Sequence, residues 1–281
     1  MNSDGLRGTL DRLERYYDAV PRSGARAEDF GPLTLFVREG QGQGWPYYAR
    51  PTLGHRGPVS VADIGDVRAR QRELGVSESF EWVAETTPGL RAAVERAGLV
   101  VHEHPLMALD LDAASPPVAS DGNAEGISVR IVGPDDPALS SALAVPYLAF
   151  ADPGTAVGAA GPAELDELVV SQADDGSVER IAGRIRAGLT CVAAAVADGT
   201  ALCAGQHQPV GEVSEIVGVG TLPSARRRGL GMKVTEALVA DAGARGVETV
   251  FLSAGDDDVA RIYSRLGFRR VGTALIAEPA G

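Results

Sequence analysis

The chain has 281 residues, about twice the length typical of one domain. Its 44% hydrophobic and 23% charged residues form an ordinary globular mixture, which excludes a disordered or fibrous protein. Lys and Arg total 26 against 38 Asp and Glu, so the formal net charge is −12. This acidic balance argues against nucleic acid and anionic membranes as partners, since both require a basic surface.

The N-terminal sequence has no apolar core of the kind found in secretory signals. The longest apolar runs, such as residues 191–197, are far shorter than the roughly 20 residues needed to cross a bilayer. We therefore expect a cytoplasmic protein.

Cys191 and Cys203 are the two cysteines, and they flank Asp198-Gly199, a strong signal for a two-residue hairpin. A hairpin centred there places Cys203 opposite Ala194, with Cys191 about 10 Å out of register. Because a disulfide needs Cα atoms within about 7 Å, we expect two buried, reduced thiols.

Residues 113–126 contain almost no large apolar side chain and many Pro, Gly and Ser residues, which predicts a linker between residues 1–112 and 127–281. In chain order, the first part is predicted to form a helix (6–20), strands (33–38 and 45–50), a helix (61–74), a strand (80–84), a helix (88–97) and a strand (99–109). The second part is predicted to form a strand (127–132), helices (139–150 and 164–186), a hairpin from residue 191, a strand (213–221), a helix (230–244), a strand (250–252), a helix (259–266) and a strand (269–276). This alternation predicts a mixed α/β fold.

The two parts echo each other at an offset of 169 residues. The offset superposes strand 80–83 on residues 249–252 and Gly98 on Gly267, without a gap. The shared pattern of strand, helix, glycine and strand suggests one fold used twice. Val94 then falls where Tyr263 stands.

Residues 222–233 hold four basic residues and no acidic one, within an otherwise acidic chain. Here a predicted strand runs into a turn with Gly229 and Gly231, and the turn opens a predicted helix. The first amides of a helix have no internal partner and lie at the positive end of its dipole. The segment therefore predicts an anion site, most simply for a pyrophosphate.

Two other phosphate motifs do not fit this segment. It lacks the G-x-x-x-x-G-K-[ST] pattern of a P-loop. A dinucleotide fingerprint starting at Gly218 and Gly220 would have Pro223 at its third glycine position.

Two motifs instead resemble those of the GNAT superfamily of acyl-CoA-dependent N-acyltransferases. Arg226-x-x-Gly229-x-Gly231 is similar to its Q/R-x-x-G-x-G/A signature, and the sequence from Tyr263 to Phe268 is similar to its Y-x-x-x-G-F ending. The resemblance covers residues 127–277. With the internal echo, it implies two GNAT-like domains in tandem, each with a central mixed sheet flanked by helices, of which the N-terminal one is degenerate and does not bind CoA.

The resemblance implies an acyl-CoA site, with acetyl-CoA or another acyl-CoA as co-substrate and no metal. The cofactor-binding residues that it implies are the backbone amides of Arg227, Arg228, Gly229, Leu230, Gly231 and Met232, the loop-shaping Arg226, and the open strand edge at Val217, Val219 and Thr221.

Two residues are the expected catalytic groups. By the resemblance, Tyr263 lies near the thioester sulfur, where its hydroxyl would stabilise the leaving thiolate. Glu215 precedes Arg226 by eleven residues, the spacing of the general base in some members. A partly buried carboxylate can take the proton that an ammonium must lose before attack. Glu212 is the alternative base.

The expected function is transfer of an acetyl or other short acyl group to a primary amine, by direct attack in a ternary complex. The resemblance implies that the small-molecule or peptide acceptor lies against residues 146–150 and Asp152. The alternatives are an inactive acyl-CoA-binding sensor or scaffold, and an interaction protein without any cofactor. Asp256 stands where many members have asparagine and is predicted to cap a helix. A monomer or a homodimer is expected.

Overall fold

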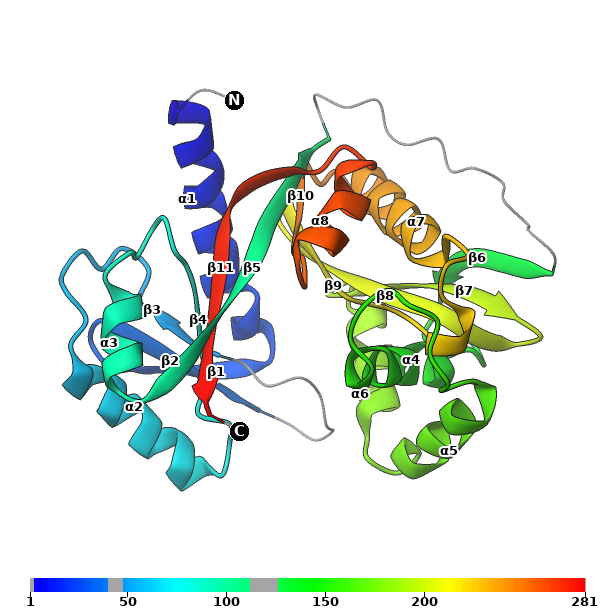
Figure 1. Cartoon of the computed structure of the whole chain (residues 1–281), viewed down its shortest axis with the longest axis horizontal. Helices are drawn as coiled ribbons and strands as arrows, with labels where there is room; N and C mark the ends of the chain where they lie inside the picture. The colour runs from blue at the N-terminus through cyan, green and yellow to red at the C-terminus, as the bar shows by residue number, and fades with distance from the viewer. Residues whose placement is uncertain (1–2, 40–47, 112–125, 281) are drawn as a thin grey trace.

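Strands from the whole chain form one sheet in the computed structural model, which describes residues 3–39, 48–111 and 126–280 (Figure 1). The sheet has 11 strands in the order β1-β2-β3-β4-β11-β5-β10-β9-β8-β7-β6. The strands are β1 (Ala25–Asp29), β2 (Leu33–Arg38), β3 (Ala49–Pro51), β4 (Phe80–Val83), β5 (Leu99–Asp110), β6 (Ile127–Val132), β7 (Cys191–Ala197), β8 (Thr200–Val210), β9 (Val213–Thr221), β10 (Thr249–Ser253) and β11 (Arg269–Pro279). The helices are α1 (Ser3–Ala19), α2 (Val61–Leu74), α3 (Leu90–Arg96), α4 (Leu139–Ala151), α5 (Pro162–Gln172), α6 (Ser177–Arg186), α7 (Leu230–Ala244) and α8 (Asp257–Ser264), with short 3-10 turns at Pro21–Ser23 and Pro223–Ala225.

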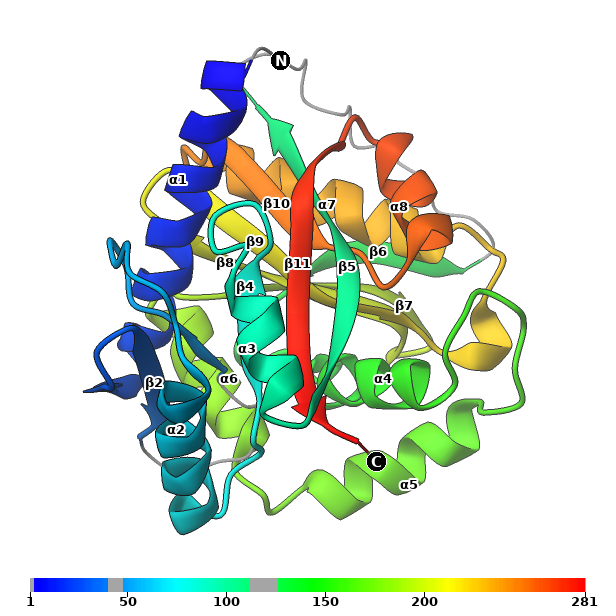
Figure 2. The same ribbon diagram turned by 60° about the vertical axis from the view of Figure 1, so that its left-hand side comes forward.

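The centre of the sheet is made by an exchange of strands between the two parts of the sequence. β5 lies between β11 and β10, and β11 lies between β4 and β5. The two strands run antiparallel from the pair Arg269 and Ala108 to the pair Pro279 and Leu99. The last strand of each part therefore pairs with the other part, and Figure 2 shows β5 and β11 side by side between them.

The internal echo of the sequence is visible in the element order. β4, α3 and β5 correspond to β10, α8 and β11 at close to the 169-residue offset. Val94, at the place of Tyr263, is fully buried in the core of the N-terminal part. The mixed α/β fold is confirmed, and one continuous sheet takes the place of two separate ones.

Helix α1 covers one face of the exchanged strands. Tyr16 and Tyr17 pack edge-on against Phe251 of β10, with ring centroids 4.9 and 5.3 Å apart. The same apolar cluster includes Val83 of β4 and Ala274 of β11. Because α1 belongs to the N-terminal part and β10 to the C-terminal part, this core joins the two.

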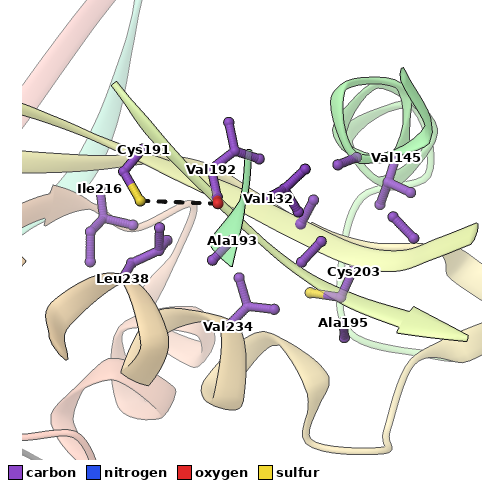
Figure 3. Close-up of a cluster of buried hydrophobic side chains, with 14 of the residues drawn as sticks. Val132, Val145, Cys191, Val192, Ala193, Ala195, Cys203, Ile216, Val234 and Leu238 are labelled. Carbon is purple, nitrogen blue, oxygen red and sulfur yellow. Dashed lines mark hydrogen bonds between the residues drawn. The ribbon is translucent and has the colours of Figure 1, made fainter. Parts of the chain in front are cut away.

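The C-terminal part has its own core on both faces of β7 and β8. Figure 3 shows Val145 of α4 on one side, and Val234 and Leu238 of α7 on the other. Cys191 and Cys203 are both buried and free, as expected. The hairpin register differs by one residue from the prediction, because an irregularity after Ala195 sets Cys203 opposite Ala195 rather than Ala194.

The structure also splits one predicted helix and adds one strand that was not predicted, and two predicted segments lie outside the described residues. The helix predicted over 164–186 is two helices, because Gly176 adopts a left-handed φ of 75° and starts α6. Strand β1 was not expected, since its Ala-Arg-Ala-Glu-Asp sequence is polar and gains its conformation from pairing with β2 at the sheet edge. The predicted linker, up to residue 125, and residues 45–47 of the expected strand lie outside the described residues.

Among the described residues, no helix is both long and apolar enough to cross a membrane.

The strand exchange predicts that neither part folds alone. Residues 1–112 and 127–281, expressed separately, should be insoluble or unfolded, because each lacks the strand that the other supplies. Coexpressed as two chains, they should associate and elute together in size-exclusion chromatography. As a control, a second fragment ending at Gly267 lacks β11 and should not associate. Cooperative melting of residues 127–281 alone would contradict this prediction.

Candidate functional site

Strand β9 leaves the neighbouring strand β10 part-way along its length. β9 pairs with β8 from Val213 to Thr221, but with β10 only from Val213 to Glu215. In the described part of the chain, no strand pairs with the β10-facing edge of β9 after Glu215. The backbone of the predicted pantetheine-binding residues therefore has an open edge.

A bulge at Gly218 changes which way the β9 side chains face. Gly218 has a φ of 65°, and the register with β8 slips between Ala204 and Gln206. After the bulge, Thr221 faces α7, because a Cβ on Gly231 would lie 3.6 Å from its Oγ1. Gly220 faces α4, where an added Cβ would come within 2.9 Å of the Pro146 backbone.

Before the bulge, Glu215 faces away from α7. Its neighbour Ser214 faces α7, since it contacts His207, which in turn contacts Asp241 of that helix. Glu215 is paired in register with Phe251, whose ring packs under α1. The bulge thus sets Glu215 on the α1 side of the sheet and Thr221 on the α7 side, with the open edge between them.

The turn before α7 is built around the buried side chain of Arg226, which is 8% exposed. Its guanidinium donates to the carbonyl oxygens of Ala149 and Ala156 at 3.0 Å, and also to that of Asp152. Arg226 therefore joins the end of α4 and the segment after it to the turn.

The amides that follow Arg226 have no acceptor among the described residues. Arg227 and Gly229 both have left-handed backbones, with φ of 65° and 72°. The first hydrogen bond of α7 runs from the Lys233 amide to the Gly229 carbonyl, and no described residue accepts from the amides of residues 227–232. Unpaired amides at a helix start, beside the exposed Arg227 and Arg228, suit a pyrophosphate.

Tyr263 is half-buried on α8, with its ring 5.9 Å from that of Phe268. Burial, and to a smaller extent the nearby Cys203, raise the pKa of Tyr263 above its ordinary value, so its hydroxyl keeps its proton. The groups that shift the pKa of Tyr263 do not include Glu215, and those that shift the pKa of Glu215 do not include Tyr263. Tyr263 lies near Cys203 and hence near the Thr221 end of β9, because Thr221 Oγ1 is 3.2 Å from the Cys203 sulfur.

Glu215 lies near charged side chains of the N-terminal part of the chain. Burial, and next the charge of Glu81 on β4, raise the pKa of Glu215 to about 8, while Arg50 on β3 opposes them. Glu212, the alternative base, is exposed in the turn before β9. Glu81 and Arg50 were not singled out in the sequence, although a charged residue within the apolar strand Phe-Glu-Trp-Val was an available signal.

Cys191, His207 and Asp241 form a cluster that sequence spacing did not indicate. One polar atom of each lies within 4.8 Å of the others. His207 is hydrogen-bonded at both ring nitrogens, at 2.8 Å to Ser214 and at 2.8 Å to Asp241, and Arg245 also binds Asp241. With both nitrogens used and a guanidinium present, the cluster fits a structural network better than a cation site.

Asp256 caps α8, as expected, by accepting a hydrogen bond from the Val259 amide at 2.8 Å.

Known proteins share this architecture. Residues 194–275 match the family model of FR47-like proteins. A GCN5-related N-acetyltransferase from Kribbella flavida superposes with a TM-score of 0.67 and 22% identity, over 97% of this chain and 96% of that one. No curated protein is detectably similar in sequence.

Two further solved structures cover most of the chain. A tandem GNAT protein from the clavulanic acid biosynthesis pathway has a TM-score of 0.53 and 16% identity, over 89% of this chain and 79% of that one. A GCN5-related N-acetyltransferase-like protein from Streptococcus suis has a TM-score of 0.54 and 11% identity, over 97% and 99%. The chain has the GNAT fold. The resemblance seen in the sequence is confirmed at that level, and the roles of individual GNAT residues stay predictions.

Arg226 and Arg227 should respond differently to the same substitution. Arg226→Met leaves three carbonyls without their donor, one of them that of buried Ala149, which should cost about 2 kcal/mol of unfolding free energy and lower the melting temperature by about 5 °C. Arg227→Met removes an exposed charge and should leave the melting temperature unchanged while weakening CoA binding. Equal melting temperatures for the two variants would contradict the structural role given to Arg226.

Proposed function

We propose that the chain transfers an acetyl or other short acyl group from acyl-CoA to a primary amine by direct attack within a ternary complex. The observation that carries this proposal is the row of unpaired amides at residues 227–232, directly after the open edge of β9. An acyl-CoA needs both features, because its pyrophosphate requires donors and its pantetheine amides require a strand-like partner.

The faces of β9 suggest how the two substrates meet. The amides at the start of α7 and Tyr263 lie on the α7 side, whereas Glu215 lies on the other side. An arm held along the edge at Val217, Val219 and Thr221 would bring its thioester to the gap between β9 and β10. The acceptor would then approach from the α1 side, next to Glu215.

One residue acts in each step of the proposed transfer. Glu215 accepts a proton from the ammonium of the acceptor, and the freed nitrogen attacks the thioester carbonyl. The carbon–sulfur bond breaks, and the Tyr263 hydroxyl stabilises the leaving sulfur by a hydrogen bond. The attacking nitrogen loses a second proton, which ends on the sulfur, and Glu215 releases the first proton to solvent. The products are an amide and a free thiol. Positioning of the two substrates on one sheet adds to these effects.

The proposal is tested by binding and turnover together. Millimolar CoA or acetyl-CoA should raise the melting temperature, and thiol release should occur with some member of a panel of primary amines. Binding without release across the panel would favour the sensor or scaffold, and no stabilisation at all would contradict both.

Tyr263→Phe should separate binding from chemistry. Removal of the phenol should leave acetyl-CoA stabilisation unchanged and lower the rate of thiol release about 100-fold, within the range for a lost acid–base group. Ser264→Ala removes a hydroxyl that only bonds the Ala260 carbonyl within the same helix, and serves as the matched control. A wild-type rate in Tyr263→Phe would remove Tyr263 from the mechanism.

The pH dependence should identify the base. Because Glu215 must be ionised to accept a proton and its pKa in the free protein is raised to about 8, kcat/KM for the acceptor should rise about tenfold per pH unit below pH 8 and level off above it. Glu215→Gln should abolish this inflection. If the inflection survives in Glu215→Gln and disappears in Glu212→Gln, Glu212 is the base instead.

A further inference from the structure

A buried ion pair of the N-terminal part lies on the same side of the sheet as Glu215. Arg50 follows Ala49 on β3 and Glu81 follows Phe80 on β4, and Ala49 and Phe80 are paired in register. The two side chains form a salt bridge with only 13% and 10% of their surfaces exposed. Val83, two residues after Glu81, packs in the cluster under α1, so Glu81 faces α1 as well.

Tyr17 of α1 connects this ion pair to β10. Its ring lies 3.8 Å from the Arg50 guanidinium carbon and has its centroid 5.3 Å from that of Phe251, the register partner of Glu215. In a flat sheet, β3 and β10 would be four spacings apart, or ~19 Å. One ring contacts side chains from both strands, so side chains of β3 and β10 converge under α1.

Groups with unmet hydrogen-bonding capacity lie on this side of the sheet. The Tyr17 hydroxyl and the Ser253 hydroxyl of β10 are buried near each other, and in the described part of the chain neither has a partner at ordinary hydrogen-bond geometry. Tyr16 is fixed nearby, since its hydroxyl donates at 2.8 Å to the carbonyl of Gln208, opposite Glu215. Buried polar atoms without partners are rare and call for an explanation such as a ligand.

The charges do not balance once Glu215 is ionised. We call Tyr17, Arg50, Glu81 and Glu215 the seam cluster; with Glu215 ionised, it holds two carboxylates against one guanidinium. Glu14 of α1, bound to Thr86, adds a further carboxylate whose pKa burial raises. Since an uncompensated charge is costly in a buried place, one more cation would stabilise the cluster.

We propose that the seam cluster is the amine subsite, where the ammonium group of a cationic acceptor binds between Glu215 and Glu81. Arg50 is a positioning residue that holds Glu81, and Tyr17 holds Arg50. The inference rests on the proposed function, and it gives the N-terminal part a role in that function, since the subsite is incomplete without β3, β4 and α1.

A bound cation has a measurable consequence for Glu215. The cation stabilises the ionised carboxylate of Glu215, so Glu215 binds its proton more weakly and its pKa falls. Loss of the Glu81 charge lowers the pKa of Glu215 in the same way. The groups that face Glu215 are Tyr16 and Tyr17 from α1, Arg50 from β3 and Glu81 from β4, with Tyr48 just before β3. The tyrosines stay neutral, because burial raises their pKa values.

The test follows the carboxyl carbon of Glu215 by NMR, in the full-length protein with labelled glutamate, as the pH is varied. Saturating n-butylammonium should weaken proton binding by Glu215 about tenfold or more, while n-butanol, of similar shape but neutral, should not change it. Glu81→Gln should produce the same weakening without any ligand and should abolish the effect of n-butylammonium.

Glu103→Gln is the matched control, because Glu103 on β5 is also paired with an arginine, Arg91, but at the exposed surface. In the Glu103→Gln variant, Glu215 should titrate as in the wild type and should respond to n-butylammonium as in the wild type. Equal effects of the amine and the alcohol, or a Glu81→Gln titration like that of Glu103→Gln, would overturn the amine subsite. The amine and alcohol comparison uses wild-type protein, so it stands even if Glu81→Gln does not fold.

The two proposals fail in different ways. If no amine in the panel gives thiol release but n-butylammonium still shifts the Glu215 titration, acyl transfer is wrong and the cation subsite stands. If thiol release occurs but neither n-butylammonium nor the Glu81→Gln substitution changes the pH at which Glu215 titrates, acyl transfer stands and the subsite is wrong.

Discussion

The antiparallel pairing of β5 with β11 is the interaction on which the rest of the structure depends. Each strand ends one part of the sequence and fills a place in the sheet of the other. Backbone hydrogen bonds of a central strand cannot be left unmade, so the two parts are bound to one geometry. That geometry brings α1 across both parts and sets Tyr16 and Tyr17 against Phe251 of β10.

A second constraint acts within β9. The bulge at Gly218 and the early divergence from β10 open the sheet between its two faces. Thr221 and the start of α7 then lie on one side, and Glu215 on the other. On the proposed function, two substrates that approach from opposite faces react through this gap, which gives the irregular strand a role in the middle of a regular sheet.

These constraints also place the N-terminal part beside Glu215. This part lacks the Arg-x-x-Gly-x-Gly pattern of residues 226–231, and buried Val94 stands in place of a tyrosine. Its Arg50, Glu81 and Tyr17 lie on the same side of the sheet as Glu215. On the proposed function, the N-terminal part supplies charged groups to the acceptor site, because the exchanged strands hold both parts in one sheet.

The sequence by itself determined the local features. Helical and alternating periodicities predicted most elements, Asp198-Gly199 predicted a hairpin, and Arg226-x-x-Gly229-x-Gly231 predicted the turn whose amides have no acceptor. These depend on neighbours a few residues apart. Only the tertiary structure decided that β5 and β11 exchange places, that Arg226 donates to carbonyls in α4 and in the segment that follows it, and that Glu81 lies beside Glu215. Those contacts join residues far apart in the chain, and no local pattern encodes a pairing that arises when two parts are folded against each other.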